Sequence, residues 1–262
     1  MLNKEGENMK SGLHADVPFE ERIAALKEMI ESSNKIVFFG GAGVSTESGI
    51  PDFRSKDGLY NQKDIQFEQY SPEYLLSHSC LYNNPKVFYE FYRQKLDCRE
   101  IKPNITHYKL AELEAAGKLK CIITQNIDGL HQKAGSKKVL EIHGTTLRNY
   151  CTVCGKEYSA DYIFNCEESI PTCTDGCKGM IRPDVVLYEE MLPQVITEAM
   201  DILHSADLLI VGGTSLTVQP AASLISYYYG KNLVIINRDK TDYDKWADIV
   251  FHERLGEVFG CL

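Results

Sequence analysis

The segment from residues 35 to 54 constrains the fold of this 262-residue chain more than any other stretch. An apolar run at residues 35–39 (KIVFF) predicts a short buried strand, and three glycines follow within the next four residues. Glycine lets a backbone turn sharply and approach a ligand without an intervening Cβ. A helix that begins near Val44 would direct its first free N–H groups at a phosphate, as in dinucleotide-binding folds. The segment therefore predicts a strand, a turn and a helix that cradle a nucleotide.

The glycine pattern itself is irregular, because Thr46 stands where GxGxxG has its third glycine. This departure argues against an ordinary nucleotide-binding dehydrogenase, and a glycine turn without a ligand is the plain alternative. Farther along, Pro51 stiffens the chain, and Phe53 and Arg54 stand side by side. An aromatic ring beside a guanidinium suits a ligand that carries both a phosphate and an aromatic base.

Apolar runs alternate with helix-like stretches along the chain. The further runs lie at residues 119–125, 207–213, 232–237 and 247–251, and the helix-like stretches include 17–33, 104–116 and 193–205. This alternation predicts an α/β fold with a parallel sheet covered on both faces. Residues 55–100, which are rich in tyrosine and phenylalanine and expected to be helical, and residues 147–183 interrupt the pattern. We expect a ligand cleft between these excursions and the carboxyl edge of the sheet.

Composition limits the class of protein. The apolar fraction of 44% is enough for an ordinary core, so a soluble globular protein is expected. The net charge of −9 argues against nonspecific binding to nucleic acid or anionic lipid. The N-terminal residues lack the apolar core of a signal peptide, and no later apolar stretch is long enough to cross a bilayer. We therefore expect a cytoplasmic protein that binds neither nucleic acid nor membranes.

Four of the nine cysteines have the spacing of a metal site. The pairs Cys151/Cys154 and Cys173/Cys177 predict four thiolates around one zinc ion, whereas Cys166 is a spare. A closed four-sulfur shell leaves no position for water, so the zinc would be structural. A nucleic-acid-binding zinc ribbon is the competing interpretation, and the scarcity of flanking lysine and arginine disfavours it.

A second polar cluster, TQNIDGLHQKAG at residues 124–135, follows a predicted strand directly. It places Gln125, Asn126 and Asp128 at the carboxyl end of that strand, where ligands bind in open α/β sheets. Their amide and carboxylate groups suit a ribose and a carboxamide, although any turn has a similar composition. Farther on, His143 precedes a glycine, and histidine is a ready base at neutral pH.

Taken together, these motifs resemble those of the sirtuins, the NAD-dependent protein deacylases, most closely a bacterial-type deacetylase. The motifs that carry the resemblance are GAGVSTESGIPDFR, TQNIDGLHQKAG, EIHG, the cysteine pairs, IRPDVV and GGTSLTVQPAA, from about residue 20 to the C-terminus. The resemblance implies one catalytic unit over residues 1–262, with a Rossmann-like large domain and a smaller one, and a cleft between them for NAD and an acylated lysine. The large domain would comprise residues 18–54, 119–146 and 184–262, and the small one a helical insertion at 55–118 and a zinc module at 147–183.

Site residues follow from the same resemblance, position by position. It implies His143 as the general base, with Asn126 as a second catalytic residue that orders the nicotinamide pocket. For NAD it implies Ala42 and Thr46 at the phosphates, Phe53 and Arg54 closing over the cofactor, and Gln125 at the nicotinamide ribose. It places Ile127 and Asp128 in the nicotinamide pocket, Thr214, Ser215 and Asn237 along the rest of the site, and Arg238 and the segment near Arg254 near the adenine. It implies Val186, Leu187 and Val218 as peptide contacts, and Cys151, Cys154, Cys173 and Cys177 as zinc ligands.

The resemblance implies transfer of an acetyl group from lysine to ADP-ribose by a monomer, with acetylated proteins or peptides as partners. Removal of succinyl or malonyl groups is an alternative, but Lys95 stands where that specificity has arginine in a Tyr-x-x-Arg pair that begins here at Tyr92. Transfer of ADP-ribose to protein would use the same cofactor site, and a nonenzymatic NAD-sensing scaffold would use it without chemistry. Where the family often has a Phe-Gly-Glu run, this chain has Leu187, Tyr188, Glu189 and Glu190, with Glu189 in place of the glycine, and we hypothesise that the acidic pair Glu189 and Glu190 favours peptides with basic flanks.

Overall fold

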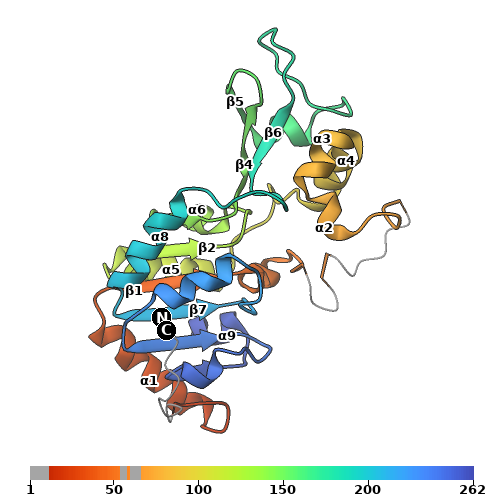
Figure 1. Ribbon diagram of the computed structural model, residues 1–262. Helices are drawn as coiled ribbons and strands as arrows, with labels where there is room; N and C mark the ends of the chain where they lie inside the picture. Colours follow the sequence, from red (N-terminus) through yellow and green to blue (C-terminus); the bar gives the residue numbers. More distant parts are fainter. Residues whose placement is uncertain (1–11, 54–57, 60–65) are drawn as a thin grey trace.

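The predicted parallel sheet is present in the computed structural model, which describes residues 12–53, 58–59 and 66–262 (Figure 1). Its six strands have the order β3-β2-β1-β7-β8-β9, and every neighbouring pair is parallel. The strands are β1 (Ile36–Gly40), β2 (Leu119–Thr124), β3 (Val139–Glu141), β7 (Leu208–Gly212), β8 (Asn232–Ile236) and β9 (Ile249–Phe251). All five apolar runs of the sequence are strands, and only the short β3 had no sequence signal.

Helices cover both faces of this sheet, as the alternation predicted. Alternate side chains of β1 point to opposite faces, so that Val37 and Phe39 enter one core and Ile36 and Phe38 the other. The first core is closed by α8 (Val195–Ser205) and the 3-10 helix η4 (Ala221–Tyr227). The second is closed by α1 (Phe19–Ser32), α5 (Ile105–Ala115) and α9 (Leu255–Gly260).

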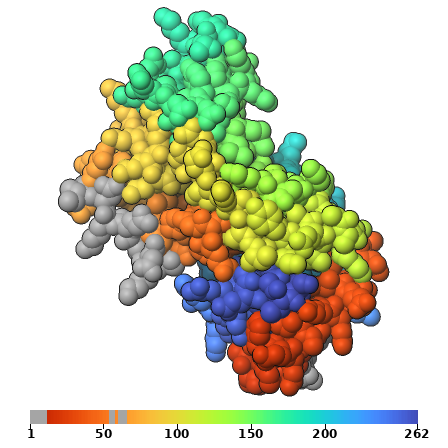
Figure 2. Space-filling view, turned by 180° about the vertical axis from the view of Figure 1, so that it is seen from behind, coloured from red at the N-terminus to blue at the C-terminus, as the bar shows by residue number. Residues whose placement is uncertain are grey.

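The two excursions from the sheet pack together at one end of the molecule (Figure 1). The first comprises α2 (Pro72–Leu75), α3 (His78–Asn83) and α4 (Pro85–Lys95). The second is an antiparallel sheet of β4 (Gly144–Cys151), β5 (Glu157–Ser159) and β6 (Ile181–Val185) with α7 (Ala160–Phe164). They share one buried core, in which aromatic side chains of α4 meet Ile163 and Ile181. Seen from behind, the excursions form the narrower end of an elongated molecule (Figure 2).

The predicted helix near Val44 is wrong. Two single 3-10 turns, η1 (Ala42–Val44) and η2 (Thr46–Ser48), stand in its place. The Asn104 side chain donates to the carbonyl oxygen of Val44 (2.8 Å) and to Ser48 Oγ (2.9 Å), and so takes up a carbonyl that a continuing helix would use.

The remaining short elements are α6 (Leu130–Lys133) and η5 (Asp244–Trp246). Within the described ranges, none of the helices combines the length and the apolar character needed to cross a bilayer.

Candidate functional site

A cavity of about 780 Å³ lies between the carboxyl edge of the large sheet and the two excursions, where the sequence predicted a cleft. On the sheet side its wall includes Gly41, Gln125 and Gly213, which directly follow β1, β2 and β7. On the other side Leu76 and Leu96 belong to the helical excursion.

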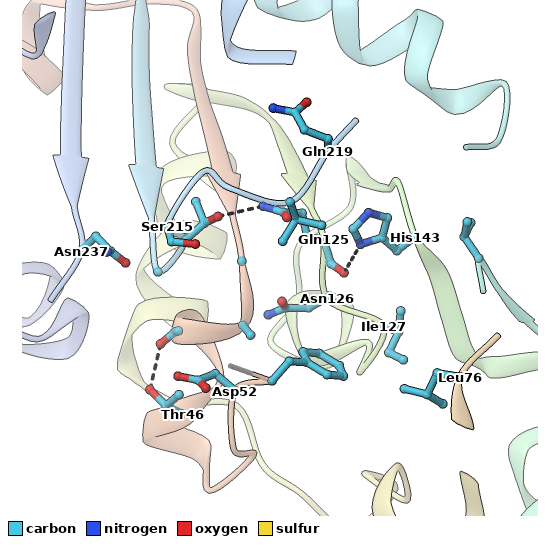
Figure 3. A pocket seen from close by; sticks show the side chains of 18 of the residues that line it. Thr46, Asp52, Leu76, Gln125, Asn126, Ile127, His143, Ser215, Gln219 and Asn237 are labelled. Carbon is cyan, nitrogen blue, oxygen red and sulfur yellow. Dashed lines mark hydrogen bonds between the residues drawn. The ribbon is translucent and has the colours of Figure 1, made fainter. Parts of the chain in front are cut away.

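The cavity gathers most of the predicted site residues, several of which are drawn in Figure 3. Its lining includes Ala42, Thr46, Phe53, Gln125, Asn126, Ile127, His143, Val186, Leu187, Thr214, Ser215, Val218, Asn237 and Arg238. Asp128 lies behind the wall, 9% exposed. Arg54 lies outside the described residues.

The glycines after β1 allow two backbone loops to touch. A Cβ on Gly43 would lie 2.7 Å from the Cα of Gly213, and the Gly43 N–H donates to the Gly213 carbonyl at 2.8 Å. Thr46 Oγ1 in turn donates to the Gly43 carbonyl oxygen at 2.9 Å (Figure 3). The turn is therefore fixed against the loop after β7, and the two loops form one wall of the cavity.

A buried chain of hydrogen bonds joins the loops after β1 and β2. Asn126 Nδ2 donates to Ser45 Oγ (3.1 Å), and Ser45 Oγ donates to Asp128 Oδ2 (2.7 Å). Asp128 Oδ1 accepts from the Leu130 N–H at 2.9 Å. Burial raises the pKa of Asp128, although the bonds from Ser45 and Leu130 act in the opposite direction. Asp128 thus orients Asn126 through Ser45 from behind the cavity wall.

His143 lines the cavity beside the loop after β2. Its Nδ1 lies 3.0 Å from the carbonyl oxygen of Gln125, as Figure 3 shows. A carbonyl oxygen only accepts, so Nδ1 carries the proton and Nε2 is the basic nitrogen of the ring. The next residue, Gly144, has φ 76°, and a Cβ there would lie 2.0 Å from the Asp184 carbonyl oxygen. Only glycine lets β4 start so close to β6, and this fixes where His143 stands.

The end of the cavity beside the excursions is apolar, with Leu76, Leu96, Ile127 and Leu187 in its lining. Tyr92 does not line it, because the ring is fully buried and stacked between Phe88 and Phe164. The cavity lining also does not include Lys95. The residues at the positions of the Tyr-x-x-Arg pair therefore do not line this cavity.

The acidic pair after β6 is not a pair of equivalent charges. Glu190 accepts from both terminal nitrogens of Arg182 (2.8 and 3.0 Å) and from the Leu187 N–H (2.9 Å). Burial acts to raise the pKa of Glu190, but its bonds, chiefly the one from Arg182, lower it overall. Glu189 is exposed and has its own partner, Ser79.

The four predicted zinc ligands form one cluster, with their sulfur atoms within 4.8 Å of one another. The Sγ atoms of Cys151 and Cys177 are 3.5 Å apart, and those of Cys154 and Cys173 are 3.7 Å apart. A tetrahedron with zinc–sulfur bonds of about 2.3 Å has sulfur–sulfur distances of about 3.8 Å, so the cluster fits zinc. The Tyr158 hydroxyl lies 3.1 Å from Cys173 Sγ and orients it.

The arrangement of strands, cavity and cysteines agrees with the motifs, and comparison with known proteins decides the family. The model of the Sir2 family matches residues 41–220. The chain belongs to the Sir2 family. It is 52% identical to an NAD-dependent protein deacetylase of Clostridium acetobutylicum, over 91% of this chain and 96% of that protein. It is 55% identical to one of Clostridium tetani, over 90% of this chain and 94% of that protein.

A solved structure extends the Sir2 comparison to the fold. A Sir2 protein with a deacetylated p53 peptide and 3′-O-acetyl-ADP-ribose is similar with a TM-score of 0.83 and 36% identity, covering 91% of this chain and 96% of that one. The sirtuin resemblance drawn from the motifs and the fold it implied are thereby confirmed.

Sequence reasoning missed some residues of the site in this Sir2 protein. Ser45 lies within a quoted motif, but its bond to Asp128, 83 positions away, has no signal in the sequence. Leu76 and Leu96 reach the cavity because of how the helical excursion folds, and an apolar residue in such a stretch is typical of a core position. The segment near Arg254, by contrast, was expected near the adenine, and Glu253, Arg254 and Leu255 do join the lining.

Proposed function

We propose that this chain is an NAD-dependent protein lysine deacetylase, which transfers the acetyl group from lysine to ADP-ribose and releases nicotinamide. The observation that carries the proposal is the cavity in which His143 and Asn126 meet the loops after β1 and β7. The curated relatives with about half of their residues in common are named as NAD-dependent protein deacetylases. A related Sir2 structure holds both products of such a reaction, a deacetylated peptide and an acetylated ADP-ribose.

In this proposal NAD lies along the carboxyl edge of the sheet. Ala42 and Thr46 hold its phosphates, and Phe53 and Arg54 close over it. Gln125 binds the nicotinamide ribose, and Ile127, Asp128 and Asn126 form and order the nicotinamide pocket. Thr214, Ser215 and Asn237 line the rest of the site, with Arg238 near the adenine. The cavity wall that includes most of these residues supports this assignment.

Bound there, NAD would supply the ADP-ribosyl group that accepts the acetyl group. The chain's own part is to align the reactants and to move one proton. The Gln125 carbonyl holds the proton of His143 on Nδ1, so that Nε2 takes a proton from a ribose hydroxyl. The apolar lining around Leu76, Leu96 and Leu187 excludes water from the acyl group.

The acylated lysine would enter between Val186 and Leu187 on one side and Val218 on the other, all in the cavity lining. A neutral acetyl group suits the apolar end of the cavity, whereas a succinyl carboxylate would be desolvated there. The zinc module would have a structural role, because four cysteines complete the tetrahedral shell.

The oligomeric state, localisation, partners and domain division of the protein are also part of the proposal. We infer a monomer that works in the cytoplasm on acetylated proteins, without direct contact with nucleic acid or membranes, and the charge of −9 supports the last point. The division into a large domain around the sheet and a small domain of helical and zinc modules, with the boundaries predicted from the sequence, remains part of the proposal.

One experiment tests the function. The protein is incubated with NAD and matched peptides that carry acetyl-, succinyl- or unmodified lysine, and the products are identified by mass spectrometry. We expect nicotinamide, free lysine peptide and O-acetyl-ADP-ribose from the acetyl peptide. ADP-ribose attached to protein would instead establish ADP-ribosyl transfer. No nicotinamide release with any peptide would overturn the enzymatic proposal and favour an NAD-sensing scaffold.

A further inference from the structure

Residues 185–190, which are the last residue of β6 and the five that follow it, form one wall of the cavity. The Val186 N–H donates to the His143 carbonyl oxygen at 2.9 Å, which ties the segment to the general base's own backbone. On the other side, the Tyr188 N–H donates to the Leu76 carbonyl (3.0 Å), and the His78 N–H donates to the Tyr188 carbonyl (3.1 Å). The wall is therefore held between the start of β4 and the helical excursion.

Glu189 stands in this wall with a left-handed backbone, φ 75°. This conformation suits glycine and is uncommon for a residue with a side chain. The carboxylate is anchored, because Glu189 Oε2 accepts from the Ser79 N–H (2.9 Å) and from Ser79 Oγ (2.7 Å). The hydrogen bonds from Ser79, first the hydroxyl and then the amide, lower the pKa of Glu189, so that it is ionised at neutral pH.

The neighbouring carboxylate makes no comparable contribution to the field at the cavity. Glu190 forms a bidentate ion pair with Arg182, which is only 9% exposed. Because the charges of Arg182 and Glu190 are opposite and in direct contact, their fields largely cancel at the cavity. The charge of Glu189 is not cancelled in this way, because its partner Ser79 is neutral. The acidic pair of the sequence thus reduces to one fixed negative charge at the exposed rim of the cavity.

We infer that Glu189 is a specificity-determining residue that favours acetyl-lysine peptides with lysine or arginine beside the acetylated position. This inference rests on the proposed deacetylase function. A lysine whose acetyl group reaches His143 leaves its backbone at the cavity mouth, and its flanking side chains then pass the rim. A carboxylate that Ser79 already holds in place loses little further freedom when it meets a cation. Because the pair is exposed to water, the preference is about twofold to fivefold in kcat/KM.

The test uses three peptides that differ only in the residues flanking the acetyl-lysine, which are arginine, glutamine or glutamate. We measure kcat/KM for each with saturating NAD, at low salt and again at several-fold higher salt. The wild-type protein should prefer the arginine peptide to the glutamate peptide by about twofold to fivefold, and less at higher salt.

Variants separate the charge from its anchor. Glu189→Gln keeps an oxygen for Ser79 but removes the charge, and its ratio between the two charged peptides should fall to about one. Ser79→Ala keeps the charge and should preserve the direction of the preference. Asp201→Asn, which removes an exposed carboxylate from α8, is the matched control and should behave as wild type.

The outcomes are distinct. An equal ratio in wild type and Glu189→Gln, or an equal fall in Glu189→Gln and Asp201→Asn, would overturn the inference. Turnover of the glutamine peptide keeps the two claims apart. If the wild-type protein does not deacetylate it, the proposed function fails. If it does and shows no charge preference, only the role of Glu189 fails.

Discussion

Two buried histidines should make the fold sensitive to mild acid. His107 and His131 are at most 1% exposed, and their ring centroids are 4.7 Å apart where α5 packs against α6. Burial lowers the pKa of His107 to about 4, and burial together with the neighbouring His107 lowers that of His131 to about 3. Within the described part of the chain, neither ring nitrogen of His131 has a hydrogen-bond partner, so a charge on that ring would be uncompensated.

The sign of the effect follows from these directions. Both histidines are neutral in the folded protein, whereas the unfolded chain binds protons below about pH 6.5. The contribution of the two neutral rings to the free energy of unfolding is therefore fully present above about pH 6.5, and it is lost as the pH falls toward the pKa values of the folded protein. At pH 5.5 each unfolded histidine gains about 1.4 kcal/mol from protonation, so the two together lower the free energy of unfolding by about 2.7 kcal/mol relative to pH 7.5.

Urea denaturation at pH 7.5 and pH 5.5, at constant ionic strength, measures this loss. The variant His131→Phe removes one titrating ring and retains an aromatic neighbour for Phe38, so it should lose only about 1.4 kcal/mol between the two pH values. His204→Gln, at an exposed position of α8, should lose as much as wild type. The raised pKa of Asp128 partly offsets the loss of stability in acid, and it does so equally in all three proteins. The difference between the variants therefore reports on His131 alone. A His131→Phe protein with the full wild-type loss would refute the reasoning.

Three further predictions concern the site. His143→Ala should lower kcat for deacetylation of the peptide by at least about two orders of magnitude with an unchanged circular dichroism spectrum, and near wild-type turnover would remove the general-base assignment. Cys154→Ser should lose the single zinc per chain in elemental analysis while Cys166→Ser retains it, and a Cys154→Ser protein with full zinc would contradict the four-cysteine site. Acetyl-lysine peptide should be turned over faster than its succinyl counterpart, and Lys95→Arg should not reverse this order, because Lys95 is not part of the cavity lining; a reversal would place that side chain at the acyl group.

Five of the six strands in the large sheet could be predicted from the sequence because each is a short apolar run within a buried sheet. The runs at 36–40 and 208–212 are buried at every position, and each is preceded by a helix with one buried face, α1 and α8. The expected helix near Val44 was wrong, and one contact that accompanies the change lies far off in sequence: the Asn104 side chain, 60 positions away, donates to the Val44 carbonyl oxygen. Local pattern contains no information on such a partner.

The residues of the candidate site also divide into those with a local sequence signal and those placed by contacts distant in sequence. Gln125, Asn126 and His143 could be predicted, since they sit in motifs at the ends of strands, and the structure brings them to one cavity. The sequence could not show which of the adjacent residues Glu189 and Glu190 keeps an unpaired negative charge at the cavity rim. Which of the two carboxylates is neutralised depends on the turn that brings Arg182 back to Glu190, and this turn is set by the packing of β6 against β4.

The four-cysteine cluster and the proposed general base His143 are joined by a single pair of strands. β4 begins one residue after His143 and ends at the zinc ligand Cys151, and it is paired at both ends with β6, whose end leads into the wall at Val186 and Leu187. Gly144 pairs with Val185 at one end of this ladder, and Cys151 pairs with Ile181 at the other. Because the module around the cysteines has few apolar side chains of its own, a zinc ion bound there would fix the far end of both strands. A metal that takes no part in the proposed chemistry would in this way hold His143 and the cavity wall at Val186 and Leu187 in register.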